Sequence, residues 1–270
     1  MSRSTLTRTT GTAIALTLVA LLLGIALPVA AMTPRTSATP SPTPSPTPTV
    51  TSVVALGDSI PFGLYCRCTP FPQLVAARLS SLTQASVTAA NDAIPGFQTS
   101  DVLRQLTTSS QAMSDVSSAD VVTIEVGAND VGYSNRCRVN VACYRPQLQS
   151  FVRNLRAIVA RVQQLSSTHG VTIVLVDYWN VWLGGKYAAK RGVAYVRASN
   201  ALTDQVHALT MATALDTNSV YVDLESAFKG PSYANDETRY LASDGDHANA
   251  AGQQLIAKAV MLAVRPALHI

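Results

Sequence analysis

The sequence predicts a three-layer α/β/α sandwich around a mainly parallel five-stranded sheet with the flavodoxin-like strand order 2-1-3-4-5. Short apolar runs alternate with helical patterns over most of the chain, as successive strand–helix units require. The strand runs are apolar throughout rather than at every second position, which indicates a sheet covered by helices on both faces. Right-handed crossovers between about five such strands favour this strand order.

The elements follow from local composition, in chain order. Residues 52–56 are apolar and end at Gly57, which predicts a short buried strand, and β-branched residues enrich 119–126. Apolar residues at helical spacing predict a helix over 71–82, and a long amphipathic helix has Pro146 in its first turn. In all, we expect strands over residues 52–56, 87–90, 119–126, 171–176 and 220–222, and helices over residues 71–82, 100–106, 146–165, 193–215 and 250–264.

The first 31 residues predict an export signal rather than part of the fold. Arg3 and Arg8 precede an uncharged apolar run, which Pro28 and a few small residues end near Ala31. This pattern is typical of a secretory signal peptide cut near Ala31, and it predicts a secreted protein. An uncleaved membrane anchor that leaves the protein facing outside is the alternative, because the run reaches about 20 residues.

Residues 32–50 predict a linker. Proline recurs at every second or third position over most of this segment, and nearly all other residues are serine or threonine. Such a sequence cannot build a core and favours an extended polyproline conformation. We therefore expect a stiff tether that would hold residues 51–270, a single folded domain, close to a cell wall or membrane.

The overall composition restricts the function classes. Hydrophobic residues make up 47% of the chain and charged residues 13%, which supplies a packed core and argues against global disorder. The net charge is +4, and lysines and arginines are scattered, so nucleic-acid binding has little support. We expect a monomer.

Four cysteines predict disulfide bonds. An even count in an exported chain is typical of disulfides, and three pairings can be drawn. A bond between Cys66 and Cys68 would close a very tight ring, which favours bonds from this pair to Cys137 and Cys143, or mixed use of the four cysteines. The spacings fit the usual zinc-binding motifs poorly, so we expect no metal.

Four polar segments carry the candidate chemistry. Three of them directly follow the first three expected strands, and the fourth precedes the last helix. The carboxyl ends of adjacent parallel strands meet at one edge of a sheet, where folds of this class bind ligands. The segments are Gly57-Asp58-Ser59, residues 91–96 with Gly96, Gly127-Ala128-Asn129-Asp130, and Asp244-Gly245-Asp246-His247.

These segments contain every group that acyl transfer needs. Ser59 supplies a hydroxyl nucleophile, His247 a base, and Asp244 a carboxylate that can orient the imidazole. The backbone N–H groups of Ser59 and Gly96 and the side-chain amide of Asn129 can donate to a developing oxyanion. Glycine at position 96 would let its N–H approach a substrate without a Cβ in the way.

Structural roles are the alternatives at several of these positions. Ser59 could instead cap a helix. Asp58 and Asp130 are expected to accept backbone hydrogen bonds in their loops. Asp246 is the poorer partner for His247 because adjacent side chains point apart.

The four motifs GDS, the glycine block, G-x-N-D and D-x-x-H resemble those of the SGNH/GDSL hydrolases over about residues 53–260. The resemblance implies the same three-layer fold, no metal or organic cofactor, and a serine ester hydrolase. It implies a triad of Ser59, His247 and Asp244, with Ser59, Gly96 and Asn129 as oxyanion donors. Ile60 stands where the family usually has leucine.

The substrate is less well defined by the sequence. The expected substrates are carboxylic esters of lipids, short acyl groups or acetylated sugars; a catalytically silent carbohydrate- or lipid-binding domain is the alternative. A flavodoxin-like cofactor binder is disfavoured because no glycine-rich phosphate loop follows the first strand. Both tryptophans, Trp179 and Trp182, lie in the loop after the fourth strand. We expect them at the substrate rim, unless they only pack that loop onto the domain.

Overall fold

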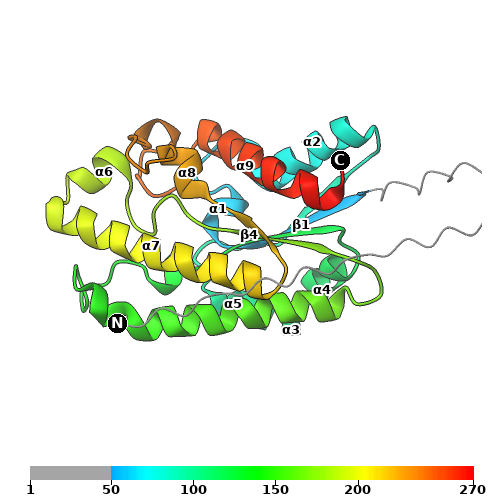
Figure 1. Cartoon of the computed structure of the whole chain (residues 1–270), viewed down its shortest axis with the longest axis horizontal. Helices are drawn as coiled ribbons and strands as arrows, with labels where there is room; N and C mark the ends of the chain where they lie inside the picture. The colour runs from blue at the N-terminus through cyan, green and yellow to red at the C-terminus, as the bar shows by residue number, and fades with distance from the viewer. Residues whose placement is uncertain (1–49) are drawn as a thin grey trace, which may run out of the picture. The chain divides into compact units, whose positions relative to one another are not determined.

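Five parallel strands form the central sheet (Figure 1). They are β1 (Ser52–Gly57), β2 (Thr88–Asn91), β3 (Val121–Glu125), β4 (Thr172–Val176) and β5 (Val220–Val222). The order is β2-β1-β3-β4-β5, and every neighbouring pair is parallel, which confirms the predicted sheet and its order. β1 and β3 are buried almost throughout, as strands covered on both faces must be.

The computed structural model describes residues 50–270. The signal peptide expected over residues 1–31 lies outside the described residues, and so does the linker expected over 32–50 except for Val50. Within the described part, no helix has the length and hydrophobicity that a membrane crossing requires.

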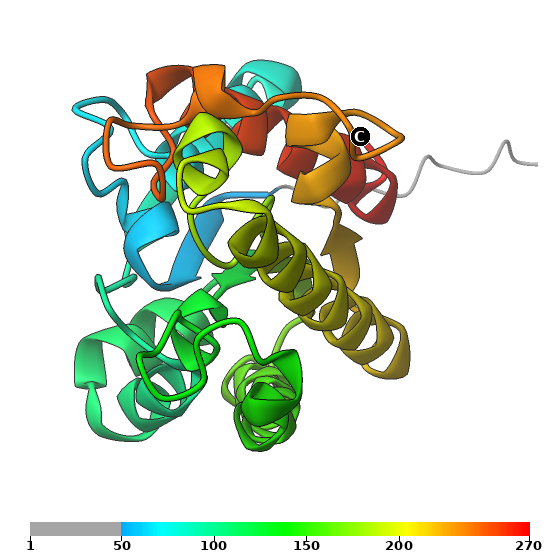
Figure 2. The same ribbon diagram turned by 90° about the vertical axis from the view of Figure 1, so that its left-hand side faces the viewer.

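Helices cover both faces of the sheet (Figure 1, Figure 2). One layer contains α2 (Phe71–Thr83), α8 (Leu224–Lys229) and α9 (Ala250–Leu268), and the other contains α3 (Thr99–Thr108), α4 (Ser110–Ser117), α5 (Arg145–Leu165) and α7 (Val193–Asp216). Within the layers α2 packs on α9, and α5 packs on both α3 and α7. All five helices expected from the sequence are present, with ends within a few residues of the expected ones.

Several short elements were not expected from the sequence. Among the helices these are α1 (Ser59–Phe62), α4, α6 (Gly185–Ala189) and α8, and the 3₁₀ turns η1 (Ala128–Asp130), η2 (Val141–Tyr144) and η3 (Thr238–Tyr240) also belong here. Most are too short to show an apolar period. The α4 sequence is mostly serine and other polar residues and buries only Ala112 and Val116.

Gly57, at the end of β1, leaves no room for a side chain against β3. Its φ is +149°, and a Cβ there would lie 2.0 Å from the carbonyl oxygen of Glu125. The Asp58 N–H donates to that same oxygen, at 3.2 Å, and the Ile94 N–H donates to the Gly57 carbonyl, at 3.0 Å. The loops that follow β1, β2 and β3 are therefore joined at one edge of the sheet.

The two disulfides differ from the expected pairing. They join Cys66 to Cys68 and Cys137 to Cys143, so the expected bonds between the two pairs are wrong. Arg67, between the first two cysteines, has a left-handed backbone with φ of +50°. That conformation turns the chain sharply and brings the two Cα atoms to 5.2 Å, within the ordinary range for a disulfide. Each disulfide thus braces its own strand-end loop.

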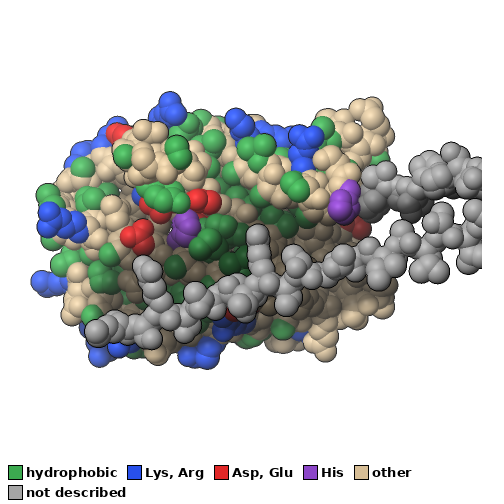
Figure 3. Space-filling view, in the orientation of Figure 1, with side chains coloured by type: hydrophobic (Ala, Val, Ile, Leu, Met, Phe, Trp, Pro, Cys, Tyr) green, Lys and Arg blue, Asp and Glu red, His purple; other side chains and the backbone are tan. Residues whose placement is uncertain are grey.

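Lysine and arginine side chains do not form one continuous patch on the domain face that Figure 3 shows. On the face shown in Figure 3, lysine and arginine side chains lie in several separate groups among hydrophobic and polar ones. This matches the scattered positions of these residues in the sequence.

Candidate active site

Ser59 begins the short helix α1 just after β1, and the residue before it caps that helix. Asp58, not Ser59, is the N-cap of α1, because its carboxylate accepts a hydrogen bond from the Ile60 N–H at 3.1 Å. Ser59 is the first residue of α1, so its hydroxyl is not used as a cap. The Ser59 Oγ lies 2.9 Å from Nε2 of His247, which is 188 residues away in sequence.

Asp244 holds the other side of the imidazole. Its Oδ2 lies 2.6 Å from Nδ1 of His247, and its Oδ1 accepts the backbone N–H groups of His247 and Asp246. Gly245 makes this turn possible, because its φ is +79° and a Cβ there would lie 2.4 Å from Tyr187. Asp246 is thus a backbone donor to Asp244 and not the partner of the ring.

The environment keeps the Asp244 carboxylate ionised. Partial burial raises the pKa of Asp244, but hydrogen bonds from the His247 ring and from two backbone N–H groups outweigh it. The pKa of Asp244 consequently lies below its usual value. A negative charge is therefore fixed beside Nδ1 of the ring.

Tyr65 covers the histidine from the loop after α1. Its ring meets the His247 ring edge to face, with centroids 5.2 Å apart. Tyr65 is 65% exposed and adjoins the disulfide between Cys66 and Cys68. This disulfide therefore restrains the loop whose tyrosine contacts the imidazole.

Asn129 and Gly96, two of the three expected oxyanion donors, are placed differently. Asn129 lies in η1 directly after β3, lines the pocket beside Ser59, and donates from Nδ2 to the Phe97 carbonyl at 2.9 Å. The amide has a second N–H, which this bond leaves free. Gly96 precedes Phe97, with φ of +82°, and a Cβ there would meet no described atom within 4 Å. The left-handed backbone by itself favours glycine at position 96, and no described residue approaches it closely.

The serine, the histidine and Asn129 share one pocket, with a volume of about 280 Å³. It lies at the carboxyl edge of the sheet, where the loops after β1, β3 and β4 meet. Its other side chains come from the segments after β1, β3 and β4, from the start of α7 and from the connection before α9. They include Asp58, Tyr133, Tyr178, Asn180, Trp182, Arg191, Tyr195 and Asp246.

The two tryptophans have different surroundings. Trp182 lines the pocket although it is only 3% exposed, and its Nε1 donates to the Val131 carbonyl at 2.8 Å. Trp179 is fully buried and stacks on Phe228 of α8, with ring centroids 4.3 Å apart. The expected place of Trp179 at the substrate rim is therefore not what the structure shows. The loop turns this ring away from the pocket and into the core.

Tyr133, Tyr178, Arg191 and Tyr195 line the pocket but were not predicted. Tyr178 lies two residues after the end of β4, and this position at a strand end could have predicted a place in the site. Tyr133 and Arg191 lie in long connections without a strand-end position or a motif, and Tyr195 lies in the first turn of α7. These residues reach the pocket only through tertiary contacts, and nothing in the local sequence predicts their place there.

Asp58 and Asp130 have the structural roles expected of them. Asp130 accepts both the N–H and the hydroxyl of Thr99, which joins η1 to the start of α3. Asp58 caps α1 and accepts the Tyr178 hydroxyl at 2.6 Å. Burial raises the pKa of Asp58 to about 7, although the hydrogen bond from Tyr178 opposes this rise.

Glu125, the last residue of β3, lies beneath this site. It is fully buried, and neither of its carboxylate oxygens has a hydrogen-bond partner among the described residues. Burial, followed by the charges of Asp58 and Asp177, raises the pKa of Glu125 well above its usual range. The side chain is therefore neutral at moderately acid pH.

This burial predicts a loss of stability as the pH rises. Above about pH 4.5 the unfolded chain releases the Glu125 proton while the folded chain keeps it. Each pH unit in that window lowers the free energy of unfolding by about 1.4 kcal/mol. Urea unfolding between pH 5 and 8 should show a shallower decline in Glu125→Gln than in wild type. Asp204→Asn, at an exposed carboxylate on α7, should follow wild type; equal slopes in all three proteins would contradict the prediction.

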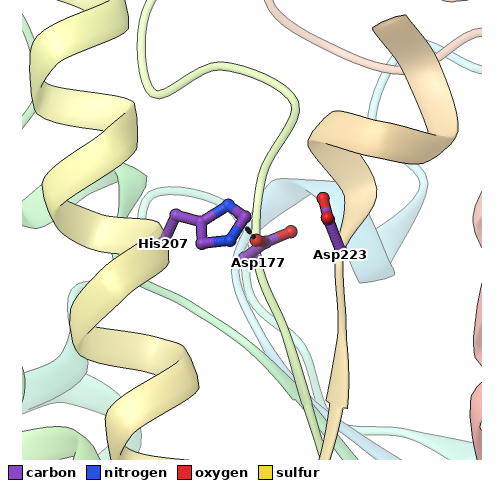
Figure 4. A group of neighbouring side chains, drawn as sticks. All are labelled: Asp177, His207 and Asp223. Carbon is purple, nitrogen blue, oxygen red and sulfur yellow. Dashed lines mark ion pairs between the residues drawn. The ribbon is translucent and has the colours of Figure 1, made fainter. Parts of the chain in front are cut away.

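Away from the pocket, three described side chains that lie close together are of the types that bind metal ions. Asp177, His207 and Asp223 have ligand atoms within 4.8 Å of one another (Figure 4). The Asp177 carboxylate accepts hydrogen bonds from the Leu224 N–H and the Tyr221 hydroxyl. One of its oxygens also lies 3.2 Å from Nδ1 of His207. These hydrogen bonds occupy the Asp177 oxygens, so we assign the group the structural role of joining β4, β5 and α7.

Known proteins resemble this chain in sequence and in fold. The model of the GDSL-like lipase/acylhydrolase family matches residues 55–255. No curated protein sequence matches the chain.

Solved structures share the fold at low sequence identity. A lipase from a goat rumen metagenome has a TM-score of 0.63 and 18% identity, covering 79% of this chain and 97% of that chain. An acetylxylan esterase from Geobacillus stearothermophilus has a TM-score of 0.57 and 19% identity, covering 80% and 96%. A lipase/acylhydrolase from Enterococcus faecalis has a TM-score of 0.54 and 18% identity, covering 81% and 97%.

The family match spans most of the described domain and includes the four polar segments at the sheet edge. The chain therefore belongs to the GDSL-like lipase/acylhydrolase family, a family of carboxylic-ester hydrolases.

Proposed function

We propose that Ser59, His247 and Asp244 are the catalytic triad with which this protein cleaves carboxylic esters. One observation carries the proposal. The Ser59 Oγ, the two ring nitrogens of His247 and the Asp244 carboxylate form an unbroken chain, with spacings of 2.9 and 2.6 Å. Such a chain passes a proton from the hydroxyl to the ring and stabilises the resulting imidazolium.

The reaction begins with attack of the Ser59 Oγ on the ester carbonyl carbon. Nε2 of His247 takes the hydroxyl proton, and Asp244 fixes the tautomer that leaves Nε2 free to accept it. The oxyanion that forms is bound by the N–H groups of Ser59 and Gly96 and by the free amide N–H of Asn129. His247 then protonates the leaving alcohol. Water, activated by the same imidazole, releases the acyl group.

A panel of 4-nitrophenyl esters and acetylated xylo-oligosaccharides tests this function. Short-chain, long-chain and sugar esters separate the three substrate classes expected from the sequence. A fluorophosphonate should also label the protein at one serine, which peptide mass spectrometry should identify as Ser59. A folded protein that turns over no ester and takes no label would support the catalytically silent binding domain instead.

Asn129→Ala should lower kcat by about 10²- to 10³-fold. The variant removes the amide that faces the pocket, while η1 stays in place through the bonds between Asp130 and Thr99. Steady-state kinetics on 4-nitrophenyl acetate measure the loss. Gln98→Ala is the matched control, because the exposed Gln98 side chain donates to the Asn129 carbonyl and does not line the pocket. Equal losses in the two variants would mean that the turn, not the amide, is responsible.

The proposal also places the protein outside the cell. Pairing of all four cysteines fits an oxidising compartment, and the export pattern of residues 1–31 would direct the chain there. Mass measurement of the protein recovered from culture medium tests this placement. A species that begins after Ala31 supports signal cleavage, whereas a full-length species in the membrane fraction supports the anchor.

A further inference from the structure

Three aromatic rings form one wall of the pocket. Tyr133, Trp182 and Tyr195, here called the aromatic wall, have mutual centroid distances of 5.1 to 5.5 Å. The polar ends of two of them are used by backbone groups, since Trp182 donates to the Val131 carbonyl and the Tyr195 hydroxyl accepts the Leu183 N–H. The rings are therefore fixed in place and offer mainly their apolar surfaces to the pocket.

Arg191 lies over this wall. Its guanidinium carbon is 5.4 Å from the centroid of the Tyr133 ring and 5.2 Å from that of Tyr195, within the range of cation–π contacts. The side chain is exposed on its other side and lines the same pocket as Ser59. Two rings thus hold a full positive charge at the mouth of the pocket.

No residue that the structure describes neutralises the Arg191 charge. Arg191 forms no ion pair and no side-chain hydrogen bond with any residue in the range 50–270. Structural arginines normally pair with a carboxylate or donate to carbonyl oxygens, whereas this one keeps its planar set of donors free. Such a set binds carboxylate or phosphate through two parallel hydrogen bonds.

The carboxylates of the pocket do not cancel this effect. Asp58 is buried, bonded to Tyr178, and has its pKa raised to about 7 by burial. Asp246 is next to His247 in the chain and repels an anion from that end of the pocket. The pocket is therefore positive at Arg191 and negative near the histidine, which would orient an anionic substrate.

The start of α7 adds to the positive side. Its N-cap is Gly192, which follows Arg191 and offers no side chain to its free N–H groups. Tyr195, in the first turn of α7, lines the pocket. The positive end of the helix dipole thus borders the same side of the pocket as the guanidinium.

We propose that Arg191 and the aromatic wall form a binding subsite for an anionic group, so that the preferred ester carries a carboxylate or phosphate. This inference rests on the proposed function of the same pocket. The anion pairs with Arg191, and the carbon skeleton that joins it to the ester lies against the aromatic wall. The volume of about 280 Å³ restricts the bound part of the substrate to a small molecule or one end of a larger one.

Two pairs of matched esters test the subsite and find the part of the substrate that carries the charge. The first pair, 4-acetoxybenzoate and 4-acetoxybenzamide, differs in charge on the leaving alcohol. The second pair, the half-ester 4-nitrophenyl adipate and 4-nitrophenyl hexanoate, differs in charge on the acyl group. In at least one pair, the ratio of kcat/KM for the anionic ester to that for the neutral ester should fall about tenfold or more in Arg191→Gln.

Two further variants separate a specific contact from a general charge effect. Arg191→Lys should keep part of the preference, because the charge remains but the planar pair of donors is lost. Lys190→Gln is the matched control: Lys190 is exposed, adjoins Arg191 and lies outside the pocket, so the ratio should equal that of wild type. Added salt should lower the ratio in wild type and leave it unchanged in Arg191→Gln.

The outcomes separate this inference from the proposed function. If wild type cleaves the neutral esters and Arg191→Gln has the same ratio as wild type in both pairs, the anionic subsite is wrong and the esterase stands. If wild type cleaves none of the four esters, the proposed function fails and the subsite fails with it. A drop confined to the first pair assigns the anion to the alcohol, and a drop confined to the second assigns it to the acyl group.

Discussion

Ser59→Ala is expected to lower kcat for 4-nitrophenyl acetate by about 10⁴- to 10⁶-fold, close to the loss from removing a whole triad. Without the hydroxyl, no acyl-enzyme can form, and only the oxyanion donors and substrate binding continue to favour the reaction. The variant should also lose all labelling by a fluorophosphonate. Pre-steady-state measurements should show no burst of nitrophenolate.

The fold should tolerate this change. The Ser59 side chain has one hydrogen-bond partner among the described residues, Nε2 of His247, and the cap of α1 comes from Asp58. The thermal midpoint of Ser59→Ala should therefore stay within a few degrees of wild type. Ser243→Ala is the matched control, at an exposed serine beside Asp244 whose side chain bonds to no described residue. Turnover by Ser59→Ala above about 1% of wild type would exclude Ser59 as the nucleophile.

The sequence predicted the sheet because its signals are local. An apolar run such as 53–56 must be buried on both faces, and a polar turn after it must lie at the carboxyl edge. Those two facts alone predict that Ser59 and Asn129 lie on neighbouring loops. Parallel strands and right-handed crossovers leave few other arrangements.

The site features that the sequence did not predict depend on tertiary contacts. Arg191 reaches the pocket because the chain between β4 and α7 brings it over Tyr133. No sequence motif predicts this contact. Trp179 and Trp182 are three residues apart in one loop, yet the path of the backbone sends one ring into the core and the other to the pocket.

Asp244→Asn should lower kcat about 10⁴-fold while leaving the turn intact. The amide oxygen of asparagine can still accept the backbone N–H groups of His247 and Asp246, so the local backbone needs no rearrangement. What is lost is the negative charge beside Nδ1 of the ring. A neutral amide can also donate to Nδ1, which favours the tautomer whose proton sits on Nε2 and cannot accept the serine proton.

The competing assignment predicts the opposite order of losses. If Asp246 oriented the ring, Asp246→Asn would cost more than Asp244→Asn, although Asp246 offers Asp244 only a backbone N–H. Asp236→Asn controls for disturbance of the same connection, because the exposed Asp236 carboxylate caps a turn at Thr238 and lies outside the pocket. Kinetics of the three variants on one neutral ester decide the point. The lowered pKa of Asp244 means that wild type keeps this charge well into acid pH, so the loss in Asp244→Asn should be equally large at pH 6 and pH 8.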